Sequence, residues 1–597
     1  MRIFTSRTFP ATTACFLAGL CSLTICALPA TLAAQTATGA PPAPAVSTLH
    51  ASARLVVVDV VVTDAQGNSV HGLPKSAFHV SESGKPQTIG SFEEHSAIPG
   101  ATRTASLPPL QPGVFTNVAS TGDSALNVLL LDRINTPVQY QVFVRQQLLN
   151  YLKTAKPNSR ITIFGLNSRL VMLQGFTSDP EILRRAMEQS NSQAPALTEG
   201  KEVGAGADVI ADQISGIEAQ LSISPQMAQA IGEMDAVDTN INENLSVDAT
   251  LHAFNQLARY LAGFPGRKNL MWFSASFPLN LMPRPTMGND PFAGTPPWKA
   301  EYLETIALLA SSHVAVYPID ARGLMPASLP TSGYTGRAQR TFSTNMFESQ
   351  SSMYEMAEDT GGKAYTNTNG LAEAVQSVVD SGSNYYTLSY TPPAAKQDEY
   401  RKIHVELEGK NDYKLAFRHG YYADSTAPPA STPPRNAIAA ASLFTAPPAM
   451  QIPFFARVLP LSATAADVVA PGDASHPQRA LDNPLSVRYS IEYSAEPRWV
   501  SASPGDDSLR HAHLEFIALA YDAQGKIIST DVKPVRITWT PAQFEAAQQH
   551  GLRYQQQLSV APQHGYSLRL LIHDLLTDRI GSIDVPLNSL QTQAPAH

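Results

Sequence analysis

The sequence predicts an α/β fold with a doubly wound sheet, flanked by all-β modules. The first observation is the stretch over residues 127–136, an apolar run that ends in Asp132, Asn135 and Thr136. Both faces of such a strand must be covered, which is typical of the central strand of a parallel sheet flanked by helices. The second observation is the sequence that follows, an amphipathic helix and another apolar strand at 161–164, which make a strand–helix–strand unit. In such sheets ligands bind just beyond the carboxyl ends of the strands, where residues 132–136 fall.

The rest of this domain, expected over residues 124–382, alternates between strands and helices. The expected strands cover residues 170–173 (an edge strand), 270–273, 314–317 and 363–366, and the expected helices cover 180–189, 247–262, 299–311 and 371–380, with a further helix that ends at 361–362. Two long loops are expected at 277–297 and 322–346. Residues 191–245 are acidic and lack strand character, and are interpreted as an inserted helical excursion.

The first 34 residues predict a secretory signal peptide. Arg2 and Arg7 precede an apolar segment that closes with small residues at 30–34. A membrane anchor is the alternative, but the apolar core is short for a span and no stop-transfer charges follow it. All three cysteines lie inside this segment, so we expect a mature chain with neither disulfides nor thiolate metal sites.

The net charge bears on the kind of partner. Cleavage removes two of the 42 basic residues and none of the 50 acidic ones, so the formal charge falls from −8 to −10. A net negative charge argues against nucleic acid as a partner.

All-β segments and linkers surround the α/β domain. A flexible leader is expected at 35–52, a small β unit at 53–95, a linker at 96–123, strands at 384–423, a second linker at 424–450 and a β-sandwich at 451–590. The strands expected in the sandwich include 526–529 and 536–539. The β unit has too few strands to be stable alone, so we expect it to pair with 384–423 around the inserted α/β domain. The tetrapeptide Asp-Ala-Gln-Gly occurs at 64–67 and again at 522–525; shared hairpin chemistry is the favoured explanation and an internal repeat the alternative.

Residues 50–425 contain several short segments that occur in a characteristic order. They are Val-Val-Val-Thr-Asp at 60–64, Leu-Pro-Lys-Ser-Ala-Phe at 73–78, Leu-Leu-Leu-Asp-Arg-Ile-Asn-Thr at 129–136, Phe-Thr-Ser-Asp at 176–179, Phe-Pro-Gly-Arg-Lys-Asn at 264–269, Thr-Gly-Gly at 360–362, Tyr-Tyr-Thr-Leu-Ser-Tyr at 385–390 and Arg-His-Gly-Tyr at 418–421. In these segments the chain resembles the von Willebrand factor type A-related proteins of Acidobacteria. The resemblance implies a Rossmann-like von Willebrand A-type domain, a class of binding module, in a secreted or envelope protein.

The resemblance also implies a position for a metal-ion-dependent adhesion site. The family pattern places Asp-x-Ser-x-Ser after the first strand, a threonine from a second loop and an aspartate after the fourth strand. Asp132 and Thr136 match the first aspartate and the second hydroxyl, but Ile134 replaces the first serine, and Ser274 and Ser276 stand where the later aspartate is expected. With so few carboxylates, we expect a degenerate site with no required cofactor and only weak affinity for Mg²⁺ or Ca²⁺. A capping carboxylate at the helix start is the structural alternative for Asp132.

Other motifs for catalysis are absent from the sequence. There is no Gly-x-Ser-x-Gly elbow, His-Glu-x-x-His helix or phosphate loop. His511 and His513 share one strand face and are candidate metal ligands, with an exposed solvated pair as the favoured interpretation. A metal-dependent hydrolase is therefore the least favoured function.

The resulting expectation is a non-enzymatic, secreted, periplasmic or cell-surface protein that binds a protein partner, as in adhesion. Its recognition face would be built from the loops at the carboxyl edge of the sheet. The candidate residues are Asp132, Arg133, Asn135, Thr136, Ser274, Ser276, Trp298, Tyr334, Arg337 and Arg340. The alternative is a structural or assembly component of the cell envelope in which the C-terminal β-sandwich binds.

Overall fold

The computed structural model describes most of the chain outside its N-terminal segment and several loops. The described residues are 55–96, 110–119, 125–155, 159–190, 245–277, 298–325, 336–393, 400–409, 412–422, 437–461, 467–468, 485–504, 509–561 and 565–591, with side chains from 346 onward in the helix that starts at 336. The predicted signal peptide, the leader and almost all of the 191–245 excursion lie outside these residues.

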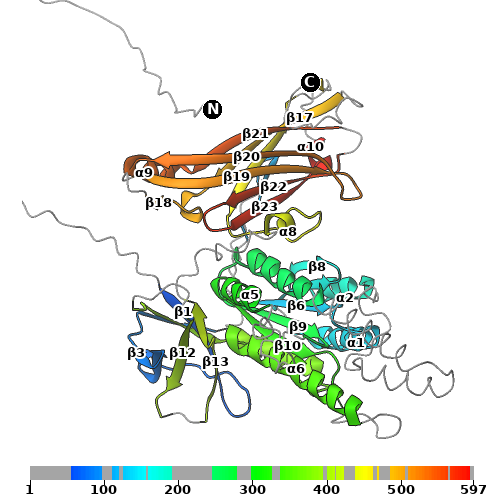
Figure 1. Ribbon diagram of the computed structural model, residues 1–597, viewed down its shortest axis with the longest axis vertical. Coiled ribbons are helices and arrows are strands. Elements are labelled where there is room, and N and C mark those ends of the chain that lie inside the picture. Colours follow the sequence, from blue (N-terminus) through cyan, green and yellow to red (C-terminus); the bar gives the residue numbers. More distant parts are fainter. Residues whose placement is uncertain are drawn as a thin grey trace, which may run out of the picture. The chain divides into compact units, whose positions relative to one another are not determined.

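One mixed sheet organises the α/β domain. Its order is β10-β9-β6-β7-β8 (Figure 1). The strands are β6 (Leu126–Asp132), β7 (Arg160–Leu166), β8 (Leu170–Thr177), β9 (Lys268–Ser274) and β10 (Val314–Asp320). Four of them pair in parallel, and β8 closes one edge antiparallel to β7. The predicted α/β class is confirmed, and β6 holds the middle place.

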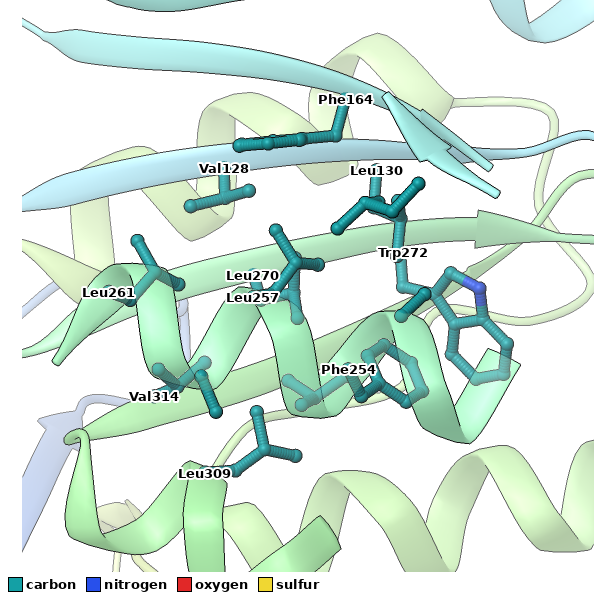
Figure 2. Close-up of a cluster of buried hydrophobic side chains, with 14 of the residues drawn as sticks. Val128, Leu130, Phe164, Phe254, Leu257, Leu261, Leu270, Trp272, Leu309 and Val314 are labelled. Atoms are coloured by element: carbon teal, nitrogen blue, oxygen red, sulfur yellow. The ribbon is translucent and has the colours of Figure 1, made fainter. Parts of the chain in front are cut away.

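Both faces of β6 are buried, because successive side chains of a strand point to opposite sides. Val128 and Leu130 belong to one apolar cluster, which also receives Phe254 from the helix over 245–261 (Figure 2). Leu129 and Leu131 belong to the other cluster, together with side chains of α1 (Val138–Thr154) and α7 (Leu371–Gly382). Burial of each such side chain is worth roughly 1.5–3 kcal/mol, so the continuous apolar run is what fixes β6 in the centre.

The remaining helices begin where local chemistry allows. In α2 (Pro180–Gln189), Asp179 caps the first turn by accepting from the backbone N–H of Glu181, and proline occupies the first turn. α5 (Lys299–Ser311) precedes β10, and α6 (Gly336–Thr360) begins inside the stretch predicted as a loop at 322–346. That prediction was wrong over its second part, because polar residues without a clear apolar stripe gave no helix signal. The predicted strand at 363–366 is reduced to a single bridge from Tyr365 to Ile319.

Strands from both sides of the α/β domain pair with each other. One sheet has the order β13-β1-β11-β4 and a second has the order β14-β12-β2-β3. The bounds are β1 (Val56–Thr63), β2 (Phe78–Glu82), β3 (Lys85–Gln87), β4 (Ser91–His95), β11 (Tyr385–Tyr390), β12 (Tyr400–Leu407), β13 (Lys414–Ala416) and β14 (Gly420–Tyr422). The two sheets contribute to one apolar cluster that contains Val58, Phe78 and Leu388.

The C-terminal strands form two further sheets that share an apolar core. The first has the order β16-β17-β15-β5 with β21 paired to β17, and the second β18-β19-β22-β23 with β20 paired to β19. The bounds are β15 (Phe454–Pro460), β16 (Asp467–Val468), β17 (Leu485–Ala495), β18 (Ser503–Pro504), β19 (Arg510–Tyr521), β20 (Ile527–Trp539), β21 (Leu552–Val560), β22 (Ser567–Asp574) and β23 (Arg579–Pro586). Short helices cover Ala437–Ala441 (α8), Pro541–His550 (α9) and Asn588–Gln591 (α10).

Two sequence expectations for this region need correction. The linker at 96–123 contributes β5 (Val114–Thr116), which pairs with β15; three residues among prolines and polar side chains carry too little pattern to reveal a strand. The strands expected at 526–529 and 536–539 are one strand, β20. Pro534 interrupts the strand pattern of β20. Proline lacks a backbone N–H, but it is tolerated in an edge strand at a position that does not have to donate to a neighbouring strand. Among the described residues, no helix is long and apolar enough to cross a membrane.

Candidate functional site

The carboxyl end of β6 is built around the carboxylate of Asp132, which is only 1% exposed. One oxygen, Oδ1, accepts from the backbone N–H of Asn135 at 3.1 Å. The other, Oδ2, accepts from three side chains: Asn135 Nδ2 at 2.8 Å, Trp272 Nε1 at 3.0 Å and Ser274 Oγ at 2.9 Å. The carboxylate therefore ties the loop after β6 to the end of β9.

Neighbouring polar groups fix the same loop from other sides. The side-chain amide of Asn135 also donates to Thr250 Oγ1 at 2.8 Å, on the helix over 245–261. Gln141, in α1, donates to the carbonyl of Thr136 at 2.8 Å. The Thr136 hydroxyl in turn accepts from the backbone N–H of Ala275 at 3.2 Å. Because these partners lie on the 245–261 helix, on α1 and directly after β9, the loop has little freedom to rearrange.

Burial dominates the electrostatics of Asp132. It raises the pKa of the carboxyl from 3.8 to about 6, against the opposing effect of the hydrogen bonds from Asn135, Ser274 and Trp272. The carboxylate is mostly ionised at neutral pH, and the hydrogen bonds that it accepts from the described residues all come from neutral donors.

The residues at this edge do not fit a hard divalent cation. Such an ion needs several oxygen ligands with negative charge among them. Here Asp132 Oδ2 already accepts from three donors, and Ile134 is a buried apolar residue of the core. The hydroxyl of Ser274 donates to Asp132 rather than facing an ion, and Arg133 adds a positive charge. Within the described residues there is no group of three His, Cys, Asp or Glu side chains that could hold a metal, and this includes the surroundings of His511 and His513 on β19.

A second carboxylate at the same edge was not identified as a site residue from the sequence. Asp320, at the end of β10, is 1% exposed and accepts two hydrogen bonds from the Arg322 guanidinium, at 2.8 and 2.7 Å. Gln350 of α6 adds a longer contact at 3.4 Å. The sequence contained a usable signal for this pair, because Asp320 and Arg322 stand at the end of a buried apolar strand. The pair holds the chain where it leaves β10.

The structure brings together only part of the predicted recognition face. Asp132, Asn135, Thr136 and Ser274 meet at one point, but all are buried, so they position the edge and do not offer exposed contact surface. Ser276 is half-buried, and its carbonyl accepts from the Ser274 hydroxyl at 2.9 Å. Trp298 precedes α5 and packs against the apolar core. Tyr334 and the side chains of Arg337 and Arg340 lie outside the described part of the chain.

Sequence reasoning also missed Trp272 and the surroundings of Arg133. The indole of Trp272 needs a hydrogen-bond acceptor once buried, and this requirement was a usable signal. Arg133 is 8% exposed and donates to Ser190 Oγ, at the end of α2. It lines a solvent-open pocket with Gln141, Arg145 and Ser190. These residues are far apart in sequence, so no pattern connects them.

Comparison with known proteins gives limited guidance. No family model and no curated protein matches the chain. Among solved structures, it is similar to an aerotolerance-related membrane protein from Bacteroides fragilis, at 15% identity and a TM-score of 0.21 over 43% of this chain and 98% of that one. It is also similar to a von Willebrand factor type A protein from Catenulispora acidiphila, at 8% identity and a TM-score of 0.20 over 59% of this chain and 76% of that one.

A third similar structure is proximal thread matrix protein 1 from the mussel byssus, at 12% identity and a TM-score of 0.20 over 45% of this chain and 49% of that one. At TM-scores this low none of the three similarities carries an argument. The assignment of the α/β class therefore rests on the strand order and the two buried faces of the sheet described above.

Proposed function

We propose that this chain is a secreted or envelope-associated binding protein of the von Willebrand A type, with a doubly wound α/β domain that recognises a protein partner. Recognition takes place at the carboxyl edge of the five-stranded sheet, on the surface around the loops that follow β6, β9 and β10. The protein acts without catalysis and without a required divalent ion, and it does not bind nucleic acid.

The observation that carries this proposal is the closed hydrogen-bond network of Asp132. Its carboxylate is buried and committed to Asn135, Trp272 and Ser274, and the carboxylate of Asp320 is committed to Arg322. The hydroxyl that donates to Asp132, that of Ser274, is fully buried, so a substrate could not reach it; this favours binding over acid–base chemistry. Groups locked in this way hold the loops of the edge in one conformation, and a preorganised surface loses less entropy when a partner binds.

Site-specific crosslinking tests where the partner binds. The three cysteines all lie within the first 34 residues, so a mature chain offers a background free of thiols. Leu324, which follows β10, is 64% exposed, and Val532, on β20 of the C-terminal sheets, is 46% exposed. Each is replaced by cysteine in the mature chain and labelled with a photo-crosslinker, and the labelled protein is exposed to an extract of the native envelope.

We expect a protein adduct from Leu324→Cys and none from Val532→Cys. The reverse pattern would favour the alternative function, an envelope assembly component that binds through its C-terminal sheets. The same adduct should form in EDTA and in Mg²⁺, since the proposal requires no ion.

Calorimetric titration of the mature chain with Mg²⁺, Mn²⁺ and Ca²⁺ provides a second test. A micromolar site that is lost in Asp132→Ala would contradict metal-independent binding.

A further inference from the structure

We propose that the pocket beside β6, formed by Arg133, Arg145, Gln141 and Ser190, binds an oxyanion: a carboxylate or a phosphate group. The inference concerns the pocket itself and does not depend on the proposed function.

Two guanidinium groups line this pocket, and their hydrogen bonds to the described residues go to neutral acceptors. Arg133 donates to the hydroxyl of Ser190, and Arg145 of α1 donates through Nε to the carbonyl of Met187 at 3.0 Å and through Nη2 to that of Glu188 at 2.9 Å. All of these acceptors are neutral. Within the described part of the chain, neither arginine forms an ion pair.

The carboxylates of Asp132 and Glu188 bind other partners. Asp132 lines the pocket, but its oxygens accept from Asn135, Trp272 and Ser274. Glu188 pairs with Arg184 on its own helix, with 2.5 Å between the charged atoms. Among the described lining residues, Asp132 supplies one negative charge against the two positive charges of Arg133 and Arg145, so one positive charge remains in excess.

Burial makes the two neighbouring positive charges of this pocket costly. Arg133 is 8% exposed, and burial together with the neighbouring charge of Arg145 lowers the pKa of its guanidinium. The apolar side chains of Leu131, Val144 and Phe273 form part of the wall, and low polarity strengthens attraction between unlike charges. A bound anion would offset the repulsion between the two guanidinium groups. It would also accept hydrogen bonds from the remaining N–H groups of both arginines. Guanidinium groups suit this task, because their planar fork matches carboxylate and phosphate oxygens.

The side chain of Gln141 gives a second reason to expect a polar ligand in this pocket. Gln141 is 8% exposed and lines the pocket, and its Nε2 donates to the carbonyl of Thr136. Its Oε1 is buried and accepts no hydrogen bond from the described residues. A buried acceptor without a donor is unfavourable by about 1–3 kcal/mol, and the O–H of a hydrogenphosphate ion is a suitable donor.

Calorimetric titration of the mature chain at constant low ionic strength tests the pocket. One probe is inorganic phosphate, and the other is a blocked tripeptide, acetyl-Gly-Asp-Gly-amide, which carries a single carboxylate. We expect saturable binding of at least one probe. Tighter binding of the peptide would identify a side chain of a protein as the natural source of the anion, and tighter binding of phosphate would identify a free phosphate or phosphoryl group.

Three variants separate a built site from general attraction by charge. Arg133→Gln and Arg145→Gln should each weaken binding by about tenfold, because each removes a charge-assisted donor. Arg185→Gln removes the same charge from an exposed position of α2 outside the pocket, and should bind as the unaltered chain does.

The melting temperature separates binding from a structural role. Without added anion, Arg133→Gln should melt no lower than the unaltered chain, because it removes a buried charge that lies near another of the same sign. Three results would overturn the inference: no saturable binding of either probe, equal loss of binding in Arg185→Gln, or binding unchanged in both Arg133→Gln and Arg145→Gln.

Discussion

The buried carboxylate of Asp132 makes stability depend on pH. Its pKa is about 6 in the folded chain and 3.8 ordinarily, so between these values the folded state holds a proton that the unfolded state has lost. Stability must then fall as pH rises from 4 to 6, by up to about 3 kcal/mol for a shift of roughly two units. Chemical denaturation of the unaltered chain and Asp132→Asn at pH 4, 5, 6 and 7 measures this. The difference between them should change up to pH 6 and then stay constant, and a difference independent of pH would show that Asp132 does not titrate in this range.

Lys268 provides a second titration with the opposite trend. It is 1% exposed at the start of β9, and its Nζ donates to the carbonyl of Ser312 at 2.9 Å. Burial lowers the pKa of the ammonium from 10.5 to about 7, against the opposing charge of Asp59. Between pH 7 and 10.5 the unfolded state binds more protons, so stability rises with pH over this window.

Lys268→Met should therefore be more stable than the unaltered chain at pH 7, and this advantage should shrink as pH approaches 10.5. By linkage, the gain in the free energy of unfolding at pH 7 is up to about 5 kcal/mol. The substitution also lowers this free energy by about 1 kcal/mol, because the carbonyl of Ser312 loses its hydrogen-bond donor. Denaturation at pH 7, 8.5 and 10 is the measurement, and His79→Gln, an exposed change on β2, is the control. An advantage that does not change with pH would indicate a packing effect instead.

At the scale of single residues, the sequence identified Asp132 and Asn135 because they directly follow a buried strand. It could not identify their partners. Trp272, Ser274 and Thr250 lie more than 100 positions away along the chain, and only the parallel pairing of β6 with β9 brings the first two to Asp132. The burial of Asp132 could not be predicted from the sequence for the same reason, because it depends on the loops that follow neighbouring strands.

Two turns with the same tetrapeptide allow a matched comparison at the scale of elements. Asp64 accepts from the backbone N–H of Gln66 and Asn68, and Asp522 accepts in the same way from Gln524 and Lys526. In both turns the glycine has a positive φ, +89° at Gly67 and +80° at Gly525. This geometry is local, and it supports shared hairpin chemistry as the explanation for the repeated tetrapeptide.

The surroundings of the two glycines differ, so the cost of replacing them should differ as well. A Cβ at Gly67 would meet nothing within 4 Å, whereas a Cβ at Gly525 would lie 2.5 Å from Cδ1 of Phe444. Gly67→Ala should cost about 1 kcal/mol, the strain of the left-handed region alone. Gly525→Ala should cost about 1–3 kcal/mol more because of the clash. Thermal denaturation of both variants is the measurement, and equal costs would mean that the Phe444 ring moves aside freely.

Elements with a strong local pattern were predictable, and those defined by distant pairing were not. β6 has apolar residues on both faces, which leaves few alternatives to a central strand. β5 has three residues, and its identity as a strand comes from pairing with β15, more than 330 positions later. The helix α6 was only partly predicted, because its first turns are polar and have no clear apolar stripe.

At the scale of the whole molecule, strands on either side of the α/β domain depend on one another. β1 lies between β11 and β13, and β2 lies between β12 and β3. The sequence predicts this pairing because the strands at 55–93 are too few to bury their own apolar side chains without further strands. The register could not be predicted, because nearly every residue of β1 is a valine and the alternation repeats every two positions.

Glu82 connects these strands through a buried network. It is 3% exposed and pairs with the guanidinium of Arg401, which is 7% exposed. It also accepts from the hydroxyls of Tyr390 at 2.7 Å and Tyr421 at 2.8 Å. All three partners follow the α/β domain in sequence, whereas Glu82 precedes it. The network thus closes the β sheets around the inserted domain.

Glu82→Ala should destabilise these sheets by about 3–5 kcal/mol, because it removes the carboxylate that balances the buried charge of Arg401. Hydrogen exchange followed by mass spectrometry is the measurement. Protection should fall together in peptides from 55–95 and from 385–422, since each set of strands supports the other, and peptides of β6 and β9 should change much less. Glu93→Ala removes an exposed carboxylate from β4 and should change protection by little, as surface substitutions usually do. Loss of protection in one of the two segments alone would mean that they fold independently, and that the network is not what joins them.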